Sequence, residues 1–117
     1  MGLLESIYKL VPLLPASELY GLASQMRRSA LSIPSNIAEG FGKNSLKDFR
    51  RFLRIAYGSA MELETQLTII SALGYGKPAN VKEASERVTI VLRLLNGFIR
   101  SLSLKITSEK RVRRTKH

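Results

Sequence analysis

The sequence predicts an all-α fold: an antiparallel up-down-up-down four-helix bundle with a short first helix and a basic C-terminal tail. Apolar residues recur at alternating spacings of three and four along most of the 117 residues, as they do on one face of a helix. No alternating apolar–polar run is flanked by hairpin signals, so no strand is expected. The links near residues 41–44 and 75–79 are short, and short links make consecutive helices antiparallel neighbours.

The first predicted helix is short. Its apolar positions run from Leu3 to Leu14. Pro12 and Pro15 end it, because the proline ring removes the backbone donor and clashes with the preceding turn.

The second predicted helix carries apolar residues from Leu19 to Ile37, with Ser17 as its N-cap and Gly40 as its C-terminal stop. Pro34 lies inside this pattern and should kink or split the helix. The bend is either a tolerated kink or a specific feature that opens a polar seam.

The third predicted helix has its apolar stripe from Phe49 to Ile70. Ser45 followed by Asp48 resembles a capping box, and Gly74 closes the helix.

The fourth predicted helix runs from Val81 to Ile106, opened by Asn80 with Glu83 three residues later. Apolar periodicity stops after it. We therefore expect a bundle domain over residues 1–108 and a flexible basic tail over residues 109–117.

Composition favours a single small domain in a reducing compartment. Hydrophobic residues make up 44% of the chain and cysteine is absent, which fits one packed core in the cytoplasm. No signal peptide or membrane-spanning run is expected. Met1, Gly2 and Ser6 fit the loose myristoylation pattern, but so short a pattern arises often by chance.

The chemistry of the sequence argues against an enzyme. The single histidine is the terminal residue His117, and no cysteine nucleophile, phosphate-binding loop or zinc motif is present. Glu62 and Glu64 lie two residues apart, so on a helix they point away from each other and form no carboxylate pair. No metal or cofactor is expected.

A polar stripe lies on the second predicted helix. It spans about 80° of the helical wheel and is rich in short amides and hydroxyls. Its members are Gln25, Arg28, Ser32, Asn36 and Glu39. Such a stripe is either an ordinary solvated face or a hydrogen-bonded contact between subunits.

Positive charge is the strongest functional signal. The net charge is +10, and residues 27–54 hold seven cations against two carboxylates. Five of these cations cover about 100° of the third helix; they are Lys43, Lys47, Arg50, Arg51 and Arg54. The tail adds Lys110, Arg111, Arg113, Arg114 and Lys116.

These two cationic sets predict contacts to the phosphates of a nucleic acid. Acidic partners at helical spacing are mostly absent, which separates the set on the third helix from an ordinary salt-bridged face. On the helical wheel Phe49 and Phe52 lie opposite the set on the third helix, and the tail set contains no aromatic residue. No aromatic residue is therefore interleaved with the cations on either surface, and stacking of single-stranded bases is not indicated. A solvated face remains the alternative.

Two segments resemble the "four helix bundle protein" family, whose members are encoded in intervening sequences of bacterial large-subunit rRNA genes. Residues 20–40 read YGLASQMRRSALSIPSNIAEG, and residues 49–66 read FRRFLRIAYGSAMELETQ. The resemblance extends over nearly all of the chain between Ile7 and Leu104. Typical members begin with one or two more turns, so the short first helix here should leave part of the core uncovered.

The resemblance implies a barrel-like homopentamer of antiparallel bundles. Related bundles act as accessory proteins of diversity-generating retroelements, where a basic pentamer binds nucleic acid and a reverse transcriptase. The motif carries no catalytic residues. Two functional hypotheses follow: a nucleic-acid-binding accessory or scaffold protein, and a structural oligomer or protein-docking hub whose charge only maintains solubility.

Overall fold

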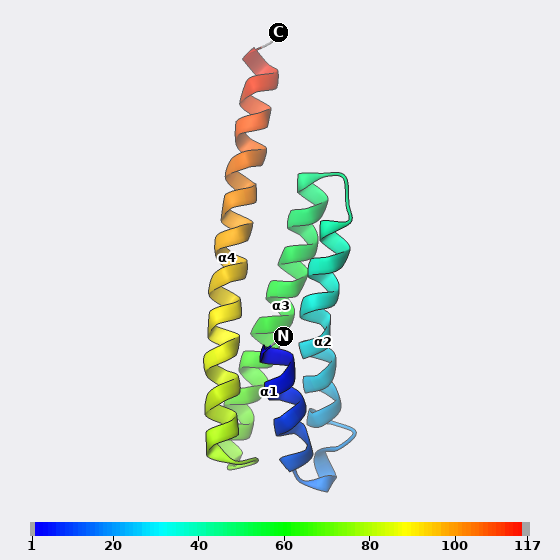
Figure 1. Cartoon of the computed structure of the whole chain (residues 1–117), viewed down its shortest axis with the longest axis vertical. Helices are drawn as coiled ribbons and strands as arrows, with labels where there is room; N and C mark the ends of the chain where they lie inside the picture. Colours follow the sequence, from blue (N-terminus) through cyan, green and yellow to red (C-terminus); the bar gives the residue numbers. More distant parts are fainter. Residues whose placement is uncertain (1, 116–117) are drawn as a thin grey trace.

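The computed structural model describes residues 2–115, which form four α-helices and no strand within that range. The helices are α1 (Gly2–Leu10), α2 (Leu22–Phe41), α3 (Leu46–Leu73) and α4 (Pro78–Thr115). Two short 3-10 helices, η1 (Val11–Leu13) and η2 (Ala16–Glu18), lie between α1 and α2. The helices form a rod of 63 × 21 × 20 Å (Figure 1), which confirms the predicted all-helical bundle.

The four helices pack in chain order around the rod. α2 packs on α3, α3 on α4, and α1 on both α4 and α2. In Figure 1 the chain descends through α1, rises through α2, descends through α3 and rises through α4. Hydrogen bonds place Ser32 beside Ser59 and Ser29 beside Gln66, so α2 and α3 pair in opposite directions.

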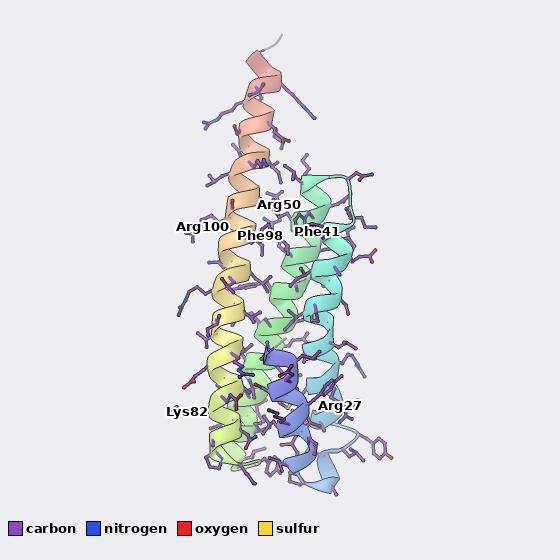
Figure 2. All side chains as sticks on the ribbon, in the orientation of Figure 1. Arg27, Phe41, Arg50, Lys82, Phe98 and Arg100 are labelled. Carbon is purple, nitrogen blue, oxygen red and sulfur yellow. The ribbon has the colours of Figure 1, made fainter. Side chains whose placement is uncertain are left out.

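The bundle is complete only in its lower half. With 9 residues, α1 is about 14 Å long, whereas the 28 residues of α3 extend about 42 Å. The N-terminal end of α1 lies at mid-height (Figure 1). Phe41 of α2 and Phe98 of α4 lie above it, at a height that α1 does not reach (Figure 2). The expectation of a partly uncovered core is consistent with the exposure of both rings.

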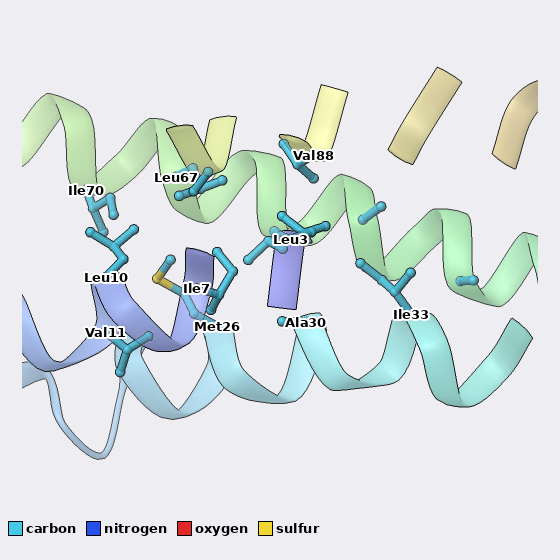
Figure 3. Packing of buried hydrophobic residues seen from close by; sticks show 14 of the residues in the cluster. Leu3, Ile7, Leu10, Val11, Met26, Ala30, Ile33, Leu67, Ile70 and Val88 are labelled. Atoms are coloured by element: carbon cyan, nitrogen blue, oxygen red, sulfur yellow. The ribbon is translucent and has the colours of Figure 1, made fainter. Parts of the chain in front are cut away.

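The apolar core lies where all four helices meet. Ile7 and Leu10 of α1 are fully buried and face Met26 of α2 and Leu67 and Ile70 of α3 (Figure 3). Removing these side chains from water stabilises the bundle by about 1.5 to 3 kcal/mol per residue. This cluster holds the short α1 in place.

The predicted ends of α3 are correct. Ser45 is the N-cap, and its hydroxyl accepts a hydrogen bond of 3.2 Å from the backbone N–H of Asp48. Gly74 ends the helix with φ of 71°, a left-handed conformation that glycine adopts without strain.

Three other predicted helix ends are wrong. Ser17 lies in η2, and α2 begins after Gly21 without a side-chain cap. Gly40 is inside α2 because it is a packing position: a Cβ there would lie 2.8 Å from the Cβ of Phe52. α4 begins at Pro78, ahead of Asn80, because proline suits the first helical turn.

Pro34 does not split α2, which continues through it as one helix. The side-chain amide of Asn36 donates to the main-chain oxygen of Ser32 at 2.8 Å and to its hydroxyl at 2.9 Å. The Ser32 hydroxyl also lies 2.8 Å from that of Ser59 on α3. Hydrogen-bonded polar side chains of α2 and α3 therefore lie close to Pro34 in the chain.

The tail was predicted incorrectly within the described range. α4 remains helical through Thr115, so residues 109–115 extend the helix instead of forming a flexible segment. Lys116 and His117 lie outside the described residues. None of the helices in residues 2–115 has the length and hydropathy needed to cross a bilayer.

Candidate nucleic-acid interface

The positive charge is concentrated at the end of the rod away from α1. We call residues 39–54 and 93–114 the distal half. It holds twelve lysines and arginines against three carboxylates, a surplus of nine out of the net +10 of the chain. The other residues carry almost no net charge together. The fold therefore gives the molecule a strongly asymmetric charge distribution along the rod.

Two chain segments that are far apart in sequence meet in the distal half. A groove of about 390 Å³ lies between the start of α3 and the last turns of α4. Lys47 lines it from α3, and Lys110 and Arg113 line it from α4, with Glu109 at the same wall. The structure thus joins the two predicted cationic sets into one surface.

Arg50 lies at the contact between α3 and α4 (Figure 2). Its Nη1 donates a hydrogen bond of 3.1 Å to the hydroxyl of Ser103. This bond orients the guanidinium and leaves other N–H groups for a ligand, since a guanidinium has five donors. Arg50 therefore has both a structural contact and a predicted binding role.

Two of the cations predicted to contact phosphates form ion pairs with acidic residues, although acidic partners were expected to be mostly absent. Lys43 forms an ion pair with Glu39 at 3.3 Å, and Arg51 forms one with Asp48 at 3.8 Å. Both pairs are exposed, so each contributes about 1 kcal/mol or less.

An aromatic ring does lie among the cations, contrary to the sequence-based expectation. The ring of Phe52 has the guanidinium of Arg51 at 4.5 Å and the ammonium of Lys43 at 5.5 Å from its centroid. The helical wheel placed Phe52 opposite the cations. Lys43, however, lies in the turn before α3, where the wheel does not apply, and the long side chain of Arg51 bends back over the ring of its neighbour. This contact fixes the direction of both cations.

The remaining predicted cations differ in their surroundings. Arg54, Arg111 and Arg114 are exposed and form no ion pair with the described residues. Because residues 109–115 are helical, Arg111 and Arg114 have fixed positions on α4. Lys116 lies outside the described residues.

Sequence reasoning missed three cations of the distal half: Arg93, Arg100 and Lys105, all exposed on α4. Arg100 points outward from the upper part of the helix (Figure 2). The seven-residue interval between Arg93 and Arg100 places them on one helical face, and this spacing was a signal available in the sequence.

The residues of the polar stripe on α2 have different surroundings in the structure. Ser32 and Asn36 are half-buried and bonded within the protomer, and Glu39 pairs with Lys43. Gln25 and Arg28 are exposed and line a second cavity between α2 and α3. The five residues therefore do not form one uniform surface.

Apolar residues are exposed beside the cations. Phe41 is 78% exposed and Phe98 49%, and the ring of Phe49 lies between them, with centroid distances of 5.9 and 5.3 Å. Exposed aromatic clusters of this kind are typical of protein contact surfaces.

The described residues contain no group of three or more histidine, cysteine, aspartate or glutamate side chains that could hold a metal ion. What the distal half offers is a set of hydrogen-bond donors and positive charges at fixed positions.

Comparisons with known proteins give one family and one fold. A family model described as "23S rRNA-intervening sequence protein" matches residues 1–97. A crystal structure from Bacteroides thetaiotaomicron, a protein of unknown function from the S23 ribosomal protein family, superposes with a TM-score of 0.69 at 23% identity. That alignment covers 83% of this chain and 97% of the other, and shows a shared fold. No curated protein matches the chain significantly.

Proposed function

The chain belongs to the family of 23S rRNA-intervening sequence proteins, and we propose that it is a non-enzymatic, homo-oligomeric protein that binds nucleic acid through its distal half. The observation that carries this proposal is the segregation of charge: a surplus of nine positive charges lies at one end of the rod. A polyanion placed there relieves the repulsion among the cations and releases condensed counterions.

The groove between α3 and α4 is the part of the distal half that we propose contacts the phosphates. Lys47, Lys110 and Arg113 converge on it from two helices, and Arg50 is oriented nearby by Ser103. Because these cations are held on helices, their binding to phosphates costs less conformational entropy than binding by a flexible tail would. Because the contacts are to phosphates, binding should depend little on base sequence.

Oligomerisation is the second part of the proposal. The aromatic cluster consists of exposed Phe41 and Phe98 with half-buried Phe49 between them, and it lies at a height that α1 does not reach. A neighbouring subunit would remove the exposed rings from water. A homopentamer is the assembly that the family resemblance implies. It would repeat the cationic groove around a ring and strengthen binding through avidity.

A salt titration tests the proposal. Affinity for a short labelled duplex DNA and for a single-stranded RNA is measured by fluorescence anisotropy at several salt concentrations. If about four phosphates are neutralised on the duplex, log K falls against log salt with a slope of about −3.6.

Two double variants with the same change in net charge test whether binding depends on the groove or only on the overall charge. Lys47→Glu with Arg113→Glu should abolish most binding, because both residues line the groove. Lys77→Glu with Lys82→Glu changes the charge equally at the opposite end of the rod and should bind nearly as wild type. Equal losses in both pairs would mean that only net charge matters. Absence of binding by the wild type would favour the structural or protein-docking hub.

A further inference from the structure

α4 carries a second apolar stripe, on the side that faces away from the core. Val88, Leu95 and Leu102 of this helix are buried, whereas the residues of the second stripe are all exposed. These exposed residues recur at alternating steps of four and three, the pattern of a helix that packs against another helix. We call them the outer stripe: Ile90, Leu94, Gly97, Ser101 and Leu104.

The outer stripe has an open middle and charged residues along one edge. A Cβ at Gly97 would meet nothing within 4 Å, so no side chain of the protomer covers that position. Glu86, Arg93 and Arg100 follow one another at seven-residue intervals and lie on one side of the stripe. Arg93 and Arg100 form no ion pair with the described residues. A partner for this stripe should bring apolar side chains to its middle, carboxylates to the arginines and a cation to Glu86.

An exposed surface on α2 and α3 offers these groups. It surrounds the cavity of about 510 Å³ between the two helices. Its α2 residues belong to the polar stripe, and its α3 residues are spaced seven apart and so share one side of that helix. We call it the α2–α3 face: Arg28 and Glu39 of α2 with Ile55, Glu62 and Ile69 of α3.

Two charged groups of the α2–α3 face are available to a partner. The Glu62 carboxylate accepts one hydrogen bond, of 3.2 Å from Ser29, and keeps further acceptor sites. Arg28 is exposed and forms no hydrogen bond or ion pair with the described residues. Gln66 lies beneath this surface: its side-chain oxygen has no hydrogen-bond partner among the described residues, but it is buried and out of reach of a partner.

The levels of the two surfaces along the rod follow from the helical rise. α3 ends and α4 begins at the same end of the rod (Figure 1). Measured from that end along α4, Glu86 lies at about 12 Å, Leu94 at about 24 Å and Arg100 at about 33 Å. Measured in the same way along α3, Ile55 lies at about 27 Å.

A contact between α2 and α3 gives the levels on α2. The hydroxyls of Ser32 and Ser59 lie 2.8 Å apart, so both residues are at a level of about 21 Å. Arg28 is then at about 15 Å and Glu39 at about 32 Å. Residues at similar levels on the two surfaces are complementary in chemistry: Glu86 and Arg28, Leu94 and Ile55, and Arg100 and Glu39.

A ring of identical subunits brings such levels together. A ring of five is closed by contacts between two different surfaces, because a self-complementary contact joins only two copies. Rotation about an axis parallel to the rod leaves the level of every residue unchanged. Residues at equal levels of neighbouring subunits therefore face each other.

We propose that the outer stripe of one subunit packs on the α2–α3 face of the next, an inference that rests on the homo-oligomer proposed above. Glu86 then pairs with Arg28, Leu94 packs on Ile55, and Arg100 pairs with Glu39. Phe98 lies one turn after Leu94, so the contact continues into the aromatic cluster. All subunits point the same way, and their distal halves form one cationic end of the ring.

Exchange of charges across the contact tests the proposal by light scattering of the full chain. Arg28→Glu alone and Glu86→Arg alone should each lower the mass well below five times 13.1 kDa, because like charges then face each other at every contact. The two changes combined should restore the mass. Both residues lie outside the distal half, so the nucleic-acid surface is unaltered.

The control for this exchange is Lys77→Glu, which makes the same charge change as Arg28→Glu in the turn between α3 and α4 and should keep the wild-type mass. An unchanged mass in both single variants, or no recovery in the combined variant, overturns the assigned contact.

Cross-linking tests the apolar part of the contact, since the chain has no cysteine of its own. Leu94→Cys with Ile55→Cys should give covalent multimers under mild oxidation, because a disulfide forms only between closely facing residues. Leu94→Cys with Met61→Cys is the control: Met61 is as exposed as Ile55 but lies on another side of α3. Absent cross-linking in the first pair, or equal cross-linking in both pairs, overturns the contact.

Failure of this contact is distinct from failure of the proposed function. A monomeric wild type removes the oligomer itself. A wild-type oligomer whose mass is not restored by the charge exchange removes only the pairing of the outer stripe with the α2–α3 face. Binding of nucleic acid by the distal half is decided by its own salt titration.

Discussion

Arg87 on α4 donates a hydrogen bond of 2.7 Å to the buried hydroxyl of Ser6 on α1. The same Nη1 also donates to the main-chain oxygen of Gly2, and Nη2 forms an ion pair of 2.9 Å with Glu83. Arg87 thus ties the N-terminal end of α1 to α4, just where the four-helix part of the rod ends. A helix of nine residues has little stability alone, so such contacts decide whether it stays docked.

Replacing Arg87 should therefore weaken the bundle. Arg87→Ala leaves Ser6 and the Gly2 carbonyl without this donor and should lower the free energy of unfolding by about 1 to 3 kcal/mol, measured by urea denaturation. Arg93→Ala, on the exposed face of the same helix, should change it by about 0.5 kcal/mol or less. Equal stability of both variants would show that the apolar face alone holds α1.

Two helical glycines should respond oppositely to the same substitution. Gly40→Ala places a Cβ 2.8 Å from Phe52 Cβ and 3.0 Å from Phe49 Cδ1, which forces α2 and α3 apart and should cost about 1 to 3 kcal/mol. At Gly58 a Cβ meets nothing within 4 Å, so Gly58→Ala should stabilise by about 0.5 to 1 kcal/mol. Thermal denaturation measures both. A Gly40→Ala variant as stable as Gly58→Ala would contradict the close packing.

The exposed aromatic cluster should control assembly. Light scattering of the wild type should give a mass near five times 13.1 kDa. Phe41→Ser combined with Phe98→Ser should lower that mass, because the contact loses apolar area. The control is Tyr20→Ser, which removes an aromatic ring that is 92% exposed at the other end of the rod and should keep the wild-type mass. A monomeric wild type would refute the assembly itself.

Removing an acidic residue from the distal half should strengthen binding to duplex DNA. Asp48→Asn frees Arg51 from its 3.8 Å ion pair and removes a negative charge, so affinity should rise by up to about fivefold. Glu86→Gln removes the carboxylate paired with Lys82 at the opposite end and should have little effect. The same anisotropy titration measures both variants, and equal gains would point to a purely long-range effect of charge.

Much of the fold was determined by local sequence. The spacing of apolar residues predicted that four helices exist, since the period of a helix is set by neighbouring residues alone, but it did not predict the last turns of α4. Ser45 and Gly74 were identified as the ends of α3 because capping depends on backbone groups only a few residues away. Composition likewise identified the chain as strongly basic.

The tertiary structure decided how these local elements are used. Gly40 looks like a helix stop in the sequence, and only the approach of Phe52 from α3 shows that it is a packing position. Lys47 and Arg113 are 66 positions apart in the sequence, and packing of α3 on α4 makes them neighbours of one groove. The unpartnered oxygen of Gln66 arises in the same way, because burial and hydrogen bonding depend on the opposing helix and no helical period encodes that helix's distance.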